Sequence, residues 1–184
     1  MPLTLVPVGV ESADICMSVG DALAQWVGLP VTLVEPVAVE VVAPEDEDGS
    51  AVPKLNVMVR RLIAAMREWP ALGVTGLELR DVRGNVIRGF AERGGRGGFV
   101  SYAGLAGTPC TGPSGPRDWT DLLAWFALHE VGHLSGLGHC GAASCVMQKY
   151  VHLTTHIAPE TPFCAECESL WEAERRVGSG GEGL

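Results

Sequence analysis

The spacing of apolar residues predicts alternating strands and helices in the first half of the chain. Residues 13–27 carry apolar side chains at helical spacing, and Gly28-Leu29-Pro30 ends that pattern. Residues 54–69 repeat the pattern and predict a second helix. The Pro- and Gly-rich segment 108–117 is predicted to be a surface loop. Runs rich in β-branched residues predict short strands at 3–8, 31–42 (one bent strand or two short ones), 74–82, 86–91 and 99–103.

A long apolar helix is predicted in the second half of the chain. Asp118 or Thr120 would cap its start, and it would run to about Ser135, where Gly136 ends it. A cysteine-bearing segment with little regular pattern follows, and then a last helix over about 164–176. Because strands and helices alternate, the sequence predicts a mixed α/β fold in which helices pack on a mainly parallel sheet.

Length, composition and charge exclude several classes of protein. A chain of 184 residues suits one compact domain. No stretch approaches the roughly 20 apolar residues of a membrane helix, and the N-terminus lacks the positive charge that begins a signal peptide. The formal net charge of -9 argues against a nucleic-acid partner. We therefore expect a cytoplasmic monomer with neither nucleic acid nor a membrane as partner.

Four of the six cysteines lie close together in the sequence, as Cys140-x4-Cys145 and Cys164-x2-Cys167. In a chain without a secretion signal, such clustering favours metal binding over disulfides. Two disulfides or free thiols are the alternatives. Cys16 and Cys110 stand apart from this group and have no evident partner.

A second group of potential metal ligands lies in the long predicted helix. His129 and His133 are four residues apart, so both imidazoles lie on one helix face and can reach the same zinc ion. Glu130 is placed to act on a metal-bound water. Gly136 can adopt the positive φ that turns the chain back, and His139 would then supply a third ligand. Three protein ligands leave one position open for water, which is typical of a catalytic zinc site.

These residues carry a resemblance to a known family. His129-Glu130-x-x-His133-x-x-Gly136-x-x-His139 is similar to the metzincin signature. The continuation through Cys140, Cys145, Met147, Cys164 and Cys167 resembles the archaemetzincins within that clan. The resemblance implies a zincin-like domain over 1–178, whose twisted, mainly parallel sheet has one antiparallel edge strand. An upper lobe would cover about 1–137 and a small zinc-stapled lower lobe about 138–178, with a flexible tail at 179–184.

The same resemblance implies roles for the residues that follow His139. Met147 would be the methionine of the Met-turn, an apolar floor beneath the three histidines, and an ordinary core methionine is the alternative. The four cysteines would hold a second, structural zinc, which makes two zinc ions in total. Physical chemistry agrees, because four thiolates complete a tetrahedral site. A lobe of about forty residues is also too small to be held by burial alone.

The expected function is that of a zinc-dependent metallopeptidase acting on peptide or protein substrates, with Glu130 as general base and acid. The strand at 99–103 is the predicted edge for pairing with an extended peptide. A non-catalytic, zinc-stabilised binding module of the same fold is the alternative. A zinc hydrolase that acts on a non-peptide amide is a third possibility.

Four further residues could contribute to the site. Tyr150, His152 and His156 could supply hydrogen bonds in the transition state, and Tyr150 or His156 could cap the metal. Ordinary positions on the surface of the lower lobe are the alternative for all three. Cys110 could act as an inhibitory thiolate on the zinc.

Overall fold

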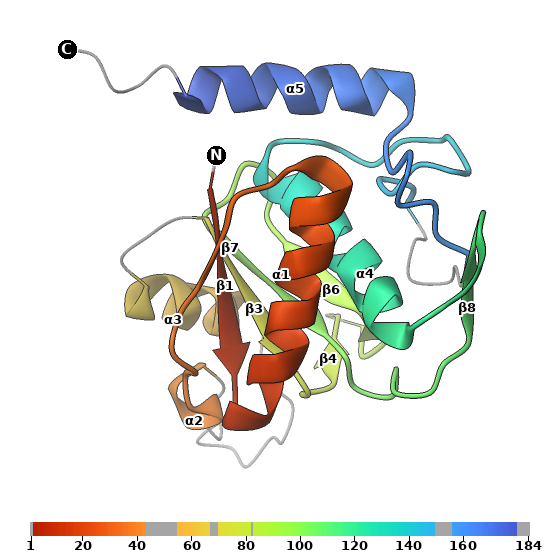
Figure 1. The fold of residues 1–184 in the computed structure, drawn as a ribbon. Coiled ribbons are helices and arrows are strands. Elements are labelled where there is room, and N and C mark those ends of the chain that lie inside the picture. The colour runs from red at the N-terminus through yellow and green to blue at the C-terminus, as the bar shows by residue number, and fades with distance from the viewer. Residues whose placement is uncertain (1, 43–54, 67–69, 82, 150–155, 180–184) are drawn as a thin grey trace.

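The structure is a computed structural model that describes residues 2–42, 55–66, 70–81, 83–149 and 156–179. A five-stranded sheet lies at its centre, in the strand order β2-β1-β3-β7-β6. Figure 1 shows the fold. Within the described residues, no helix combines the length and the apolar character needed to cross a bilayer.

The sheet is parallel except at one edge. Strands β1 (Leu3–Val8), β2 (Val31–Leu33), β3 (Ala71–Thr75) and β7 (Gly97–Ser101) run in parallel, and β6 (Gly89–Ala91) pairs antiparallel with β7. Every residue of β1, β3 and β7 is buried, as expected for parallel strands covered on both faces. The predicted mixed α/β fold, with a mainly parallel sheet and one antiparallel edge strand, is confirmed.

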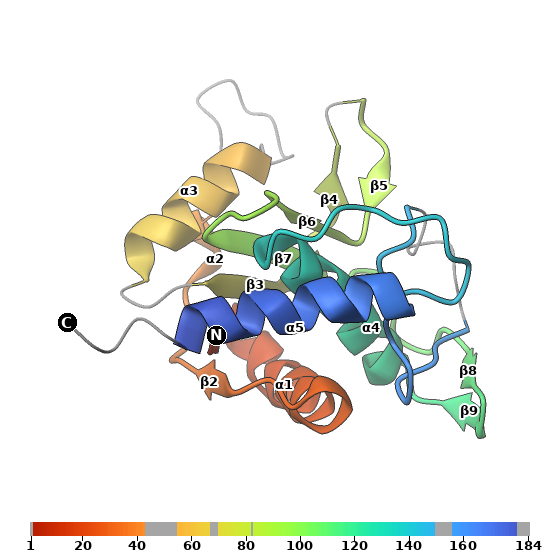
Figure 2. The ribbon, with the colours of Figure 1, turned by 90° about the horizontal axis from the view of Figure 1, so that it is seen from above.

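Helices cover both faces of the sheet (Figure 2). Helices α1 (Ala13–Val27) and α4 (Trp119–Leu134) share one apolar cluster with Leu3 and Leu5 of β1. Helix α3 (Leu55–Ala65) lies on the opposite face, in a second cluster with Val6 and Val8 of the same strand. Alternate residues of β1 therefore serve the two layers. Helix α5 (Ala165–Ser179) crosses over the end of the α1–α4 layer, and its Trp171 is buried in the first cluster.

Two segments have a secondary structure that the pattern did not predict. The segment 31–42 contains only the three-residue strand β2 and then the short helix α2 (Val39–Val42), because Val42 packs into the cluster under α3. The predicted loop at 108–117 is instead a hairpin of β8 (Cys110–Gly112) and β9 (Gly115–Arg117). Gly115 has a φ of 117°, so a Pro- and Gly-rich composition here makes a tight turn between strands.

The strands before the long helix also differ from the prediction. Strand β3 begins directly after Pro70 and ends at Thr75, and a separate small hairpin of β4 (Leu79–Arg80) and β5 (Val86–Ile87) follows it. Strand β7 lies inside the sheet, between β3 and β6. The prediction that 99–103 is the edge available to a peptide was therefore wrong, because β6 folds back and covers that side. The edge strand on that side of the sheet is β6.

The predicted helices are present with modest shifts at their ends. Helix α3 ends at Ala65, and residues 67–69 of its predicted span lie outside the described residues. Helix α5 runs to Ser179, three residues beyond the predicted end. Of the predicted tail, only residue 179 is described, and it belongs to α5.

Candidate metal centre and active-site cleft

Helix α4 starts at a well-formed cap, which one of the two predicted capping residues supplies. The carboxylate Oδ1 of Asp118 accepts hydrogen bonds from the backbone N–H and the hydroxyl of Thr120, both at 2.8 Å. The backbone hydrogen bond is the main reason that the pKa of Asp118 lies below its usual value. Asp118 is therefore the capping residue, and Thr120 is its donor.

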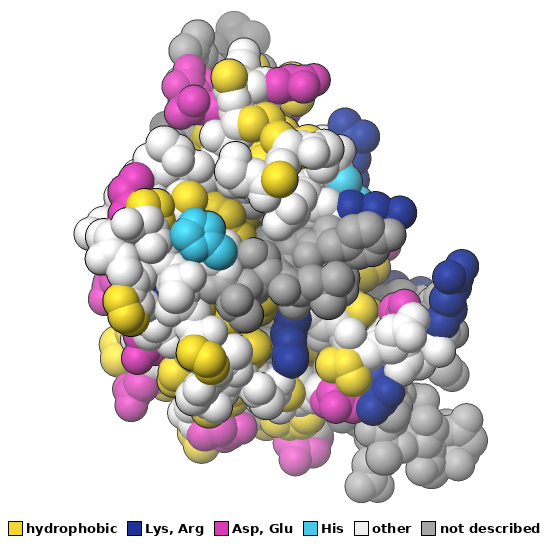
Figure 3. All heavy atoms as spheres, turned by 90° about the vertical axis from the view of Figure 1, so that its right-hand side faces the viewer, with side chains coloured by type: hydrophobic (Ala, Val, Ile, Leu, Met, Phe, Trp, Pro, Cys, Tyr) yellow, Lys and Arg dark blue, Asp and Glu magenta, His cyan; other side chains and the backbone are white. Residues whose placement is uncertain are grey.

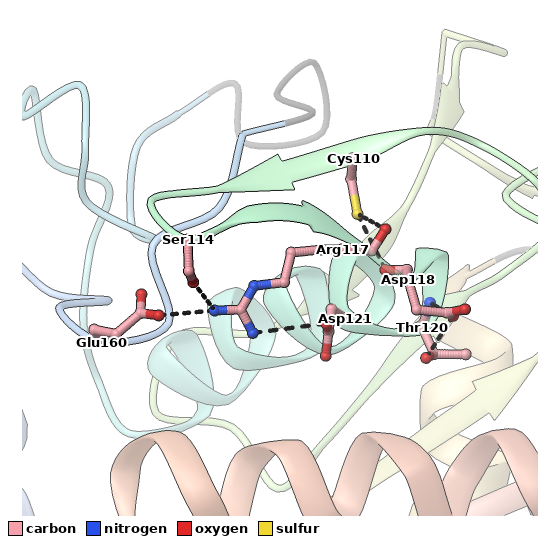
Figure 4. A network of polar contacts seen from close by, with 7 residues as sticks. All are labelled: Cys110, Ser114, Arg117, Asp118, Thr120, Asp121 and Glu160. Atoms are coloured by element: carbon pink, nitrogen blue, oxygen red, sulfur yellow. Dashed lines mark hydrogen bonds and ion pairs between the residues drawn. The ribbon is translucent and has the colours of Figure 1, made fainter.

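A polar network ties this helix start to its neighbours (Figure 4). The guanidinium of Arg117 contacts Glu160 at 2.7 Å and Asp121 at 3.8 Å, which joins the β8–β9 hairpin to α4 and to a later loop. The thiol of Cys110 donates to the backbone oxygen of Asp118 at 3.0 Å. This position is roughly 16 Å along the helix axis from His129. The idea that Cys110 is an inhibitory zinc ligand was therefore wrong.

Helix α4 ends in a turn that sends the chain back toward its own last residues. Gly136 has a φ of 87°, its N–H donates to the oxygen of His133 at 2.9 Å, and the N–H of Leu137 donates to the oxygen of Gly132 at 2.9 Å. These two bonds form a Schellman motif, which the left-handed conformation of a glycine permits. The oxygen of Leu137 then lies 2.9 Å from Nδ1 of His133. The turn therefore both redirects the chain and orients a histidine.

The three histidines of the predicted site converge. The Nε2 atom of His133 lies 3.1 Å from Nε2 of His129 and 3.2 Å from Nε2 of His139. His129 is buried, His133 is partly buried and His139 is exposed. The helix supplies the first two imidazoles, and the turn after Gly136 supplies the third.

The orientation of these rings fits a metal ion. Backbone oxygens face Nδ1 of His129 (Val146, 2.7 Å) and Nδ1 of His133 (Leu137, 2.9 Å), so both Nδ1 atoms carry the proton. Their Nε2 lone pairs then point at each other, which is repulsive unless a cation lies between them. Tetrahedral zinc with Zn–N bonds of about 2.0–2.1 Å separates its nitrogen ligands by about 3.3 Å. The observed separations match that value, and the backbone oxygens act as orienting partners of the kind seen around zinc histidines.

Glu130 lies beside this group and is enclosed by the edge strand. Its side chain is 6% exposed, and burial raises the pKa of the carboxyl to about 8. A Cβ atom on Gly89 of β6 would lie only 2.5 Å from Oε1 of Glu130. The glycine therefore provides the space in which the carboxylate sits. Gly89 was not predicted as a site residue, although a glycine within a predicted strand is a signal of such a close approach.

Met147 packs beneath the helix that carries the histidines. The side chain is fully buried, and a Cβ atom on Gly132 would lie 2.3 Å from its Sδ atom. Gly132 stands between the paired histidines of α4, so the methionine reaches the helix backbone at the level of the imidazoles. The geometry agrees with an apolar floor beneath the three rings.

The four clustered cysteines also come together, away from the cleft. One sulfur atom from each of Cys140, Cys145, Cys164 and Cys167 lies within 4.8 Å of the others. The Sγ of Cys145 accepts backbone N–H groups of Met147 and Cys164, both at 3.4 Å. Burial raises the pKa of Cys145 to about 11, so this sulfur needs a nearby cation to become a thiolate near neutral pH. Four converging sulfurs fit a closed tetrahedral zinc site.

The two groups share a short segment of backbone. His139 and Cys140 are adjacent, and the N–H of Cys140 donates to the oxygen of Met147 at 2.9 Å. One residue earlier, the oxygen of Val146 faces His129. The segment that contains Cys145 therefore holds two of the three histidines in place.

A cleft opens over the three histidines. It has a volume of about 490 Å³, and β6 forms one wall while the end of α4 forms its floor. Burial is the main cause that lowers the pKa of His133 and His139, and the nearby charges of Arg93 and Lys149 contribute. The residues that line the cleft are Ile87, Arg88, Gly89, Phe90, Ala91, Arg93, Phe126, His129, Glu130, His133, Gly138, His139 and Lys149.

The remaining predicted residues lie elsewhere. His156 pairs with β8, where its Nδ1 is 3.2 Å from the hydroxyl of Thr111, and it does not line the cleft. Its proposed role as a cap on the metal was therefore wrong. Tyr150 and His152 lie outside the described residues. Cys16 is buried in the first apolar cluster, where burial raises the pKa of its thiol to about 12.

Comparison with known proteins shows which proteins this chain resembles. A family model described as peptidase family M54 matches residues 125–173, which contain both groups of potential ligands. The chain is 27% identical to the archaemetzincin of Haloarcula marismortui, over 91% of this chain and 98% of that protein. The chain is thus similar to the archaemetzincins over almost its whole length. It is accordingly a zinc metallopeptidase, and the resemblance and the enzyme class predicted from the sequence are confirmed.

Two crystal structures of archaemetzincins have the same fold. The protein of Archaeoglobus fulgidus, solved in complex with malonate, superposes with a TM-score of 0.70 at 23% identity and covers 92% of this chain and 99% of its own. The protein of Methanopyrus kandleri gives a TM-score of 0.70 at 21% identity and covers 96% of each chain. At these identities the superpositions establish the architecture alone.

Proposed function

We propose that this protein hydrolyses peptide bonds at the three histidines, with Glu130 as the proton-transferring residue. The observation that carries the proposal is the convergence of three Nε2 atoms, two of them 3.1 and 3.2 Å from the third, beside a buried carboxyl in an open cleft. His129, His133 and His139 would hold a catalytic zinc. When bound, that ion supplies a Lewis acid that polarises the scissile carbonyl and makes water more acidic.

The position of Glu130 supports this role in proton transfer. It follows His129 directly in α4, packs against Gly89 of β6 and lines the same cleft as the three histidines. In the proposed reaction, the carboxylate takes one proton as the water oxygen bonds to the carbonyl carbon. The same carboxyl then donates that proton to the nitrogen when the C–N bond breaks. A single residue thus serves as base and then as acid.

The wall formed by β6 supplies a place for the substrate backbone. Strand β6 is the antiparallel edge of the sheet and lines the cleft directly opposite the helix that carries Glu130. An extended peptide added to this edge would lie over the histidines, and main-chain hydrogen bonds would fix its register. Peptide and protein substrates of this extended form are therefore the proposed partners.

The four cysteines complete the proposal with a second, structural zinc. A division into an upper lobe through about residue 137 and a lower lobe from about 138 to 178 follows from this assignment, because the cysteine centre joins 140–145 to the start of α5. A monomeric state and a cytoplasmic location stay predictions from the sequence.

Replacement of Glu130 by Gln tests the mechanism. The variant keeps the size of the side chain and removes the base, so we expect peptide turnover to fall by about 1,000-fold or more while metal content stays unchanged. Turnover is measured on a library of unmodified peptides by mass spectrometry. Retained turnover in the variant would remove Glu130 from the mechanism.

Metal analysis separates the enzyme from a non-catalytic binding module. We expect two zinc ions per chain, one of which a chelator removes readily from the exposed histidine centre. One chelator-resistant zinc, with no second ion and no turnover after zinc is added back, would support the binding module instead. Cleavage of non-peptide amides by the zinc-loaded protein would support the third possibility, a zinc hydrolase that acts on such amides.

A further inference from the structure

The cleft differs in charge from the rest of the molecule. The whole chain has 22 acidic and 13 basic residues. The cleft, by contrast, is lined by three basic side chains, Arg88, Arg93 and Lys149, and by one acidic side chain, Glu130. On the face drawn in Figure 3, basic side chains flank one of the histidines. An acidic protein thus concentrates positive charge where its substrate would bind.

Arg93 is the basic residue that the structure ties to the turn leading to His139. It follows β6, and its Nε donates to the oxygen of Gly136 at 2.5 Å. Its Nη1 lies 3.4 Å from the position of a Cβ atom on Gly138, in the loop that leads to His139. The guanidinium is therefore tied to this turn through one N–H, and within the part of the chain that the structure describes its Nη1 and Nη2 donors remain available for a ligand.

The other two basic residues extend the positive region along the cleft. Arg88 stands at the opposite end of β6, and its Nη1 donates to the oxygen of Ala103. Lys149 lies close enough to His139 for the two charges to act on each other. Among the described residues, no carboxylate lies within ion-pair distance of Arg88 or Arg93. A guanidinium with only a backbone oxygen as partner keeps most of its capacity for a carboxylate.

We propose that the cleft selects peptides that carry a carboxylate near the scissile bond, with Arg93 as the main recognition residue. The inference rests on the proposed peptidase function and adds its substrate class. The carboxylate has two sources, an Asp or Glu side chain within the peptide or the carboxyl group at its C-terminus. Arg93 is placed to bind either one through two parallel N–H donors.

A purely structural role for Arg93 makes a different prediction. If the residue only braced the turn at Gly136, its removal would weaken the binding of every peptide alike, because the loop that carries His139 would shift. A recognition role affects the ratio between acidic and neutral peptides. That ratio is the readout that separates the two roles.

Binding to the zinc-loaded Glu130→Gln variant tests the proposal without dependence on turnover. Four fluorescent peptides of equal length are compared by anisotropy: neutral and amidated, neutral with a free C-terminus, amidated with an internal Glu, and amidated with an internal Lys. We expect at least one of the two carboxylate peptides to bind about 10- to 100-fold more tightly than the neutral amide, and the Lys peptide to bind most weakly. The carboxylate peptide that binds tightly identifies the source.

Adding Arg93→Gln to the Glu130→Gln variant should lower the preference for a carboxylate peptide over the neutral amide by about 10-fold or more. The neutral peptide should still bind within about 2-fold of its original affinity. Arg61→Gln is the matched control, because Arg61 is exposed on α3, outside the cleft, and its loss changes the net charge equally. Equal binding of all four peptides, or an equal loss for all four in Arg93→Gln, would overturn the proposal. Selective binding by a protein that shows no turnover when zinc-loaded would instead count against the peptidase mechanism alone.

Discussion

The histidine centre and the cysteine centre adjoin at residues 139 and 140, yet they differ in how far they are exposed to solvent. The first consists of His129, His133 and His139, and the second of Cys140, Cys145, Cys164 and Cys167. The histidines open onto a cleft of about 490 Å³, and His139 is exposed. The cysteines supply four sulfurs from two segments, and Cys145 and Cys167 are buried. An open set of three ligands suits chemistry, whereas a closed set of four suits cross-linking. Since His139 and Cys140 are neighbours, a metal ion bound by the cysteines would also hold His139 in position.

We expect the histidine centre to depend on the cysteine centre, but not the reverse. The cysteine centre holds the Val146 oxygen that orients His129 and the backbone next to His139. The histidine centre, by contrast, contributes only side-chain contacts to this segment, and one of its three histidines, His139, is exposed. Damage to the closed centre should therefore reach the open one, whereas damage to the open centre should stay local.

The largest effect is expected from Cys145→Ser. Cys145 is fully buried, and its sulfur accepts two backbone N–H groups, so the substitution should release the structural zinc and loosen the segment that supports both centres. We expect both zinc ions to be lost, turnover to fall below detection, and the melting temperature to drop by about 10 °C or more. Elemental analysis after desalting and thermal unfolding measure these changes.

His139→Ala is the counterpart that sharpens this prediction. It should remove one zinc and the activity but leave the cysteine zinc and most of the melting temperature in place. A Cys145→Ser protein that retained a zinc at the histidines and normal turnover would break the proposed dependence of one centre on the other.

Gly89→Ala should affect catalysis with little change in stability. The added Cβ would lie 2.5 Å from Oε1 of Glu130 and would force that flexible side chain to move. We expect turnover to fall by about 10- to 100-fold, as for a misplaced catalytic group. The control is the double variant with Glu130→Gln, in which the glycine substitution should cause no additional loss. An additional loss of the same size would mean that Gly89 acts on the substrate rather than through Glu130.

Gly132→Ala should weaken both centres to a smaller degree. A Cβ atom at this position would lie 2.3 Å from Sδ of the fully buried Met147, so the methionine or the helix must shift. Overpacking of this kind costs about 1–3 kcal/mol in the free energy of unfolding. Gly141→Ala is a matched control, because a Cβ there meets nothing within 4 Å. Denaturant unfolding of the two variants should differ by that amount, and equal stability would refute the packing role of Met147.

Local sequence signals predicted much of the secondary structure, and the predictions that were wrong have identifiable physical causes. The cap at Asp118 and the turn at Gly136 depend on short-range hydrogen bonds, so the sequence pattern located α4 correctly. The edge strand depends on long-range pairing: β6 folds back antiparallel onto β7, and nothing in the local pattern of either segment specifies that arrangement.

The candidate site shows the same division between residues positioned by local structure and residues positioned by long-range strand pairing. The spacing of His129, His133 and His139 indicated their convergence, because a helix and one turn determine it. Gly89 and Arg93 were missed, since they reach the site only through the position of β6 beside α4. Residues brought in by the sheet require the assembled fold before their roles become visible.

The smallest effect is expected from Asp118→Ala, which separates the stability of α4 from the chemistry at its other end. The carboxylate caps the first turn through Thr120 and touches neither centre, so its loss should cost about 1 kcal/mol of unfolding free energy. Metal content and turnover should stay unchanged, because the ligands lie at the opposite end of the helix. Asp118→Asn retains an oxygen acceptor and should recover most of the loss. If the alanine variant lost zinc from the histidines, the integrity of the open centre would depend on the whole helix and not chiefly on the cysteine-bearing segment.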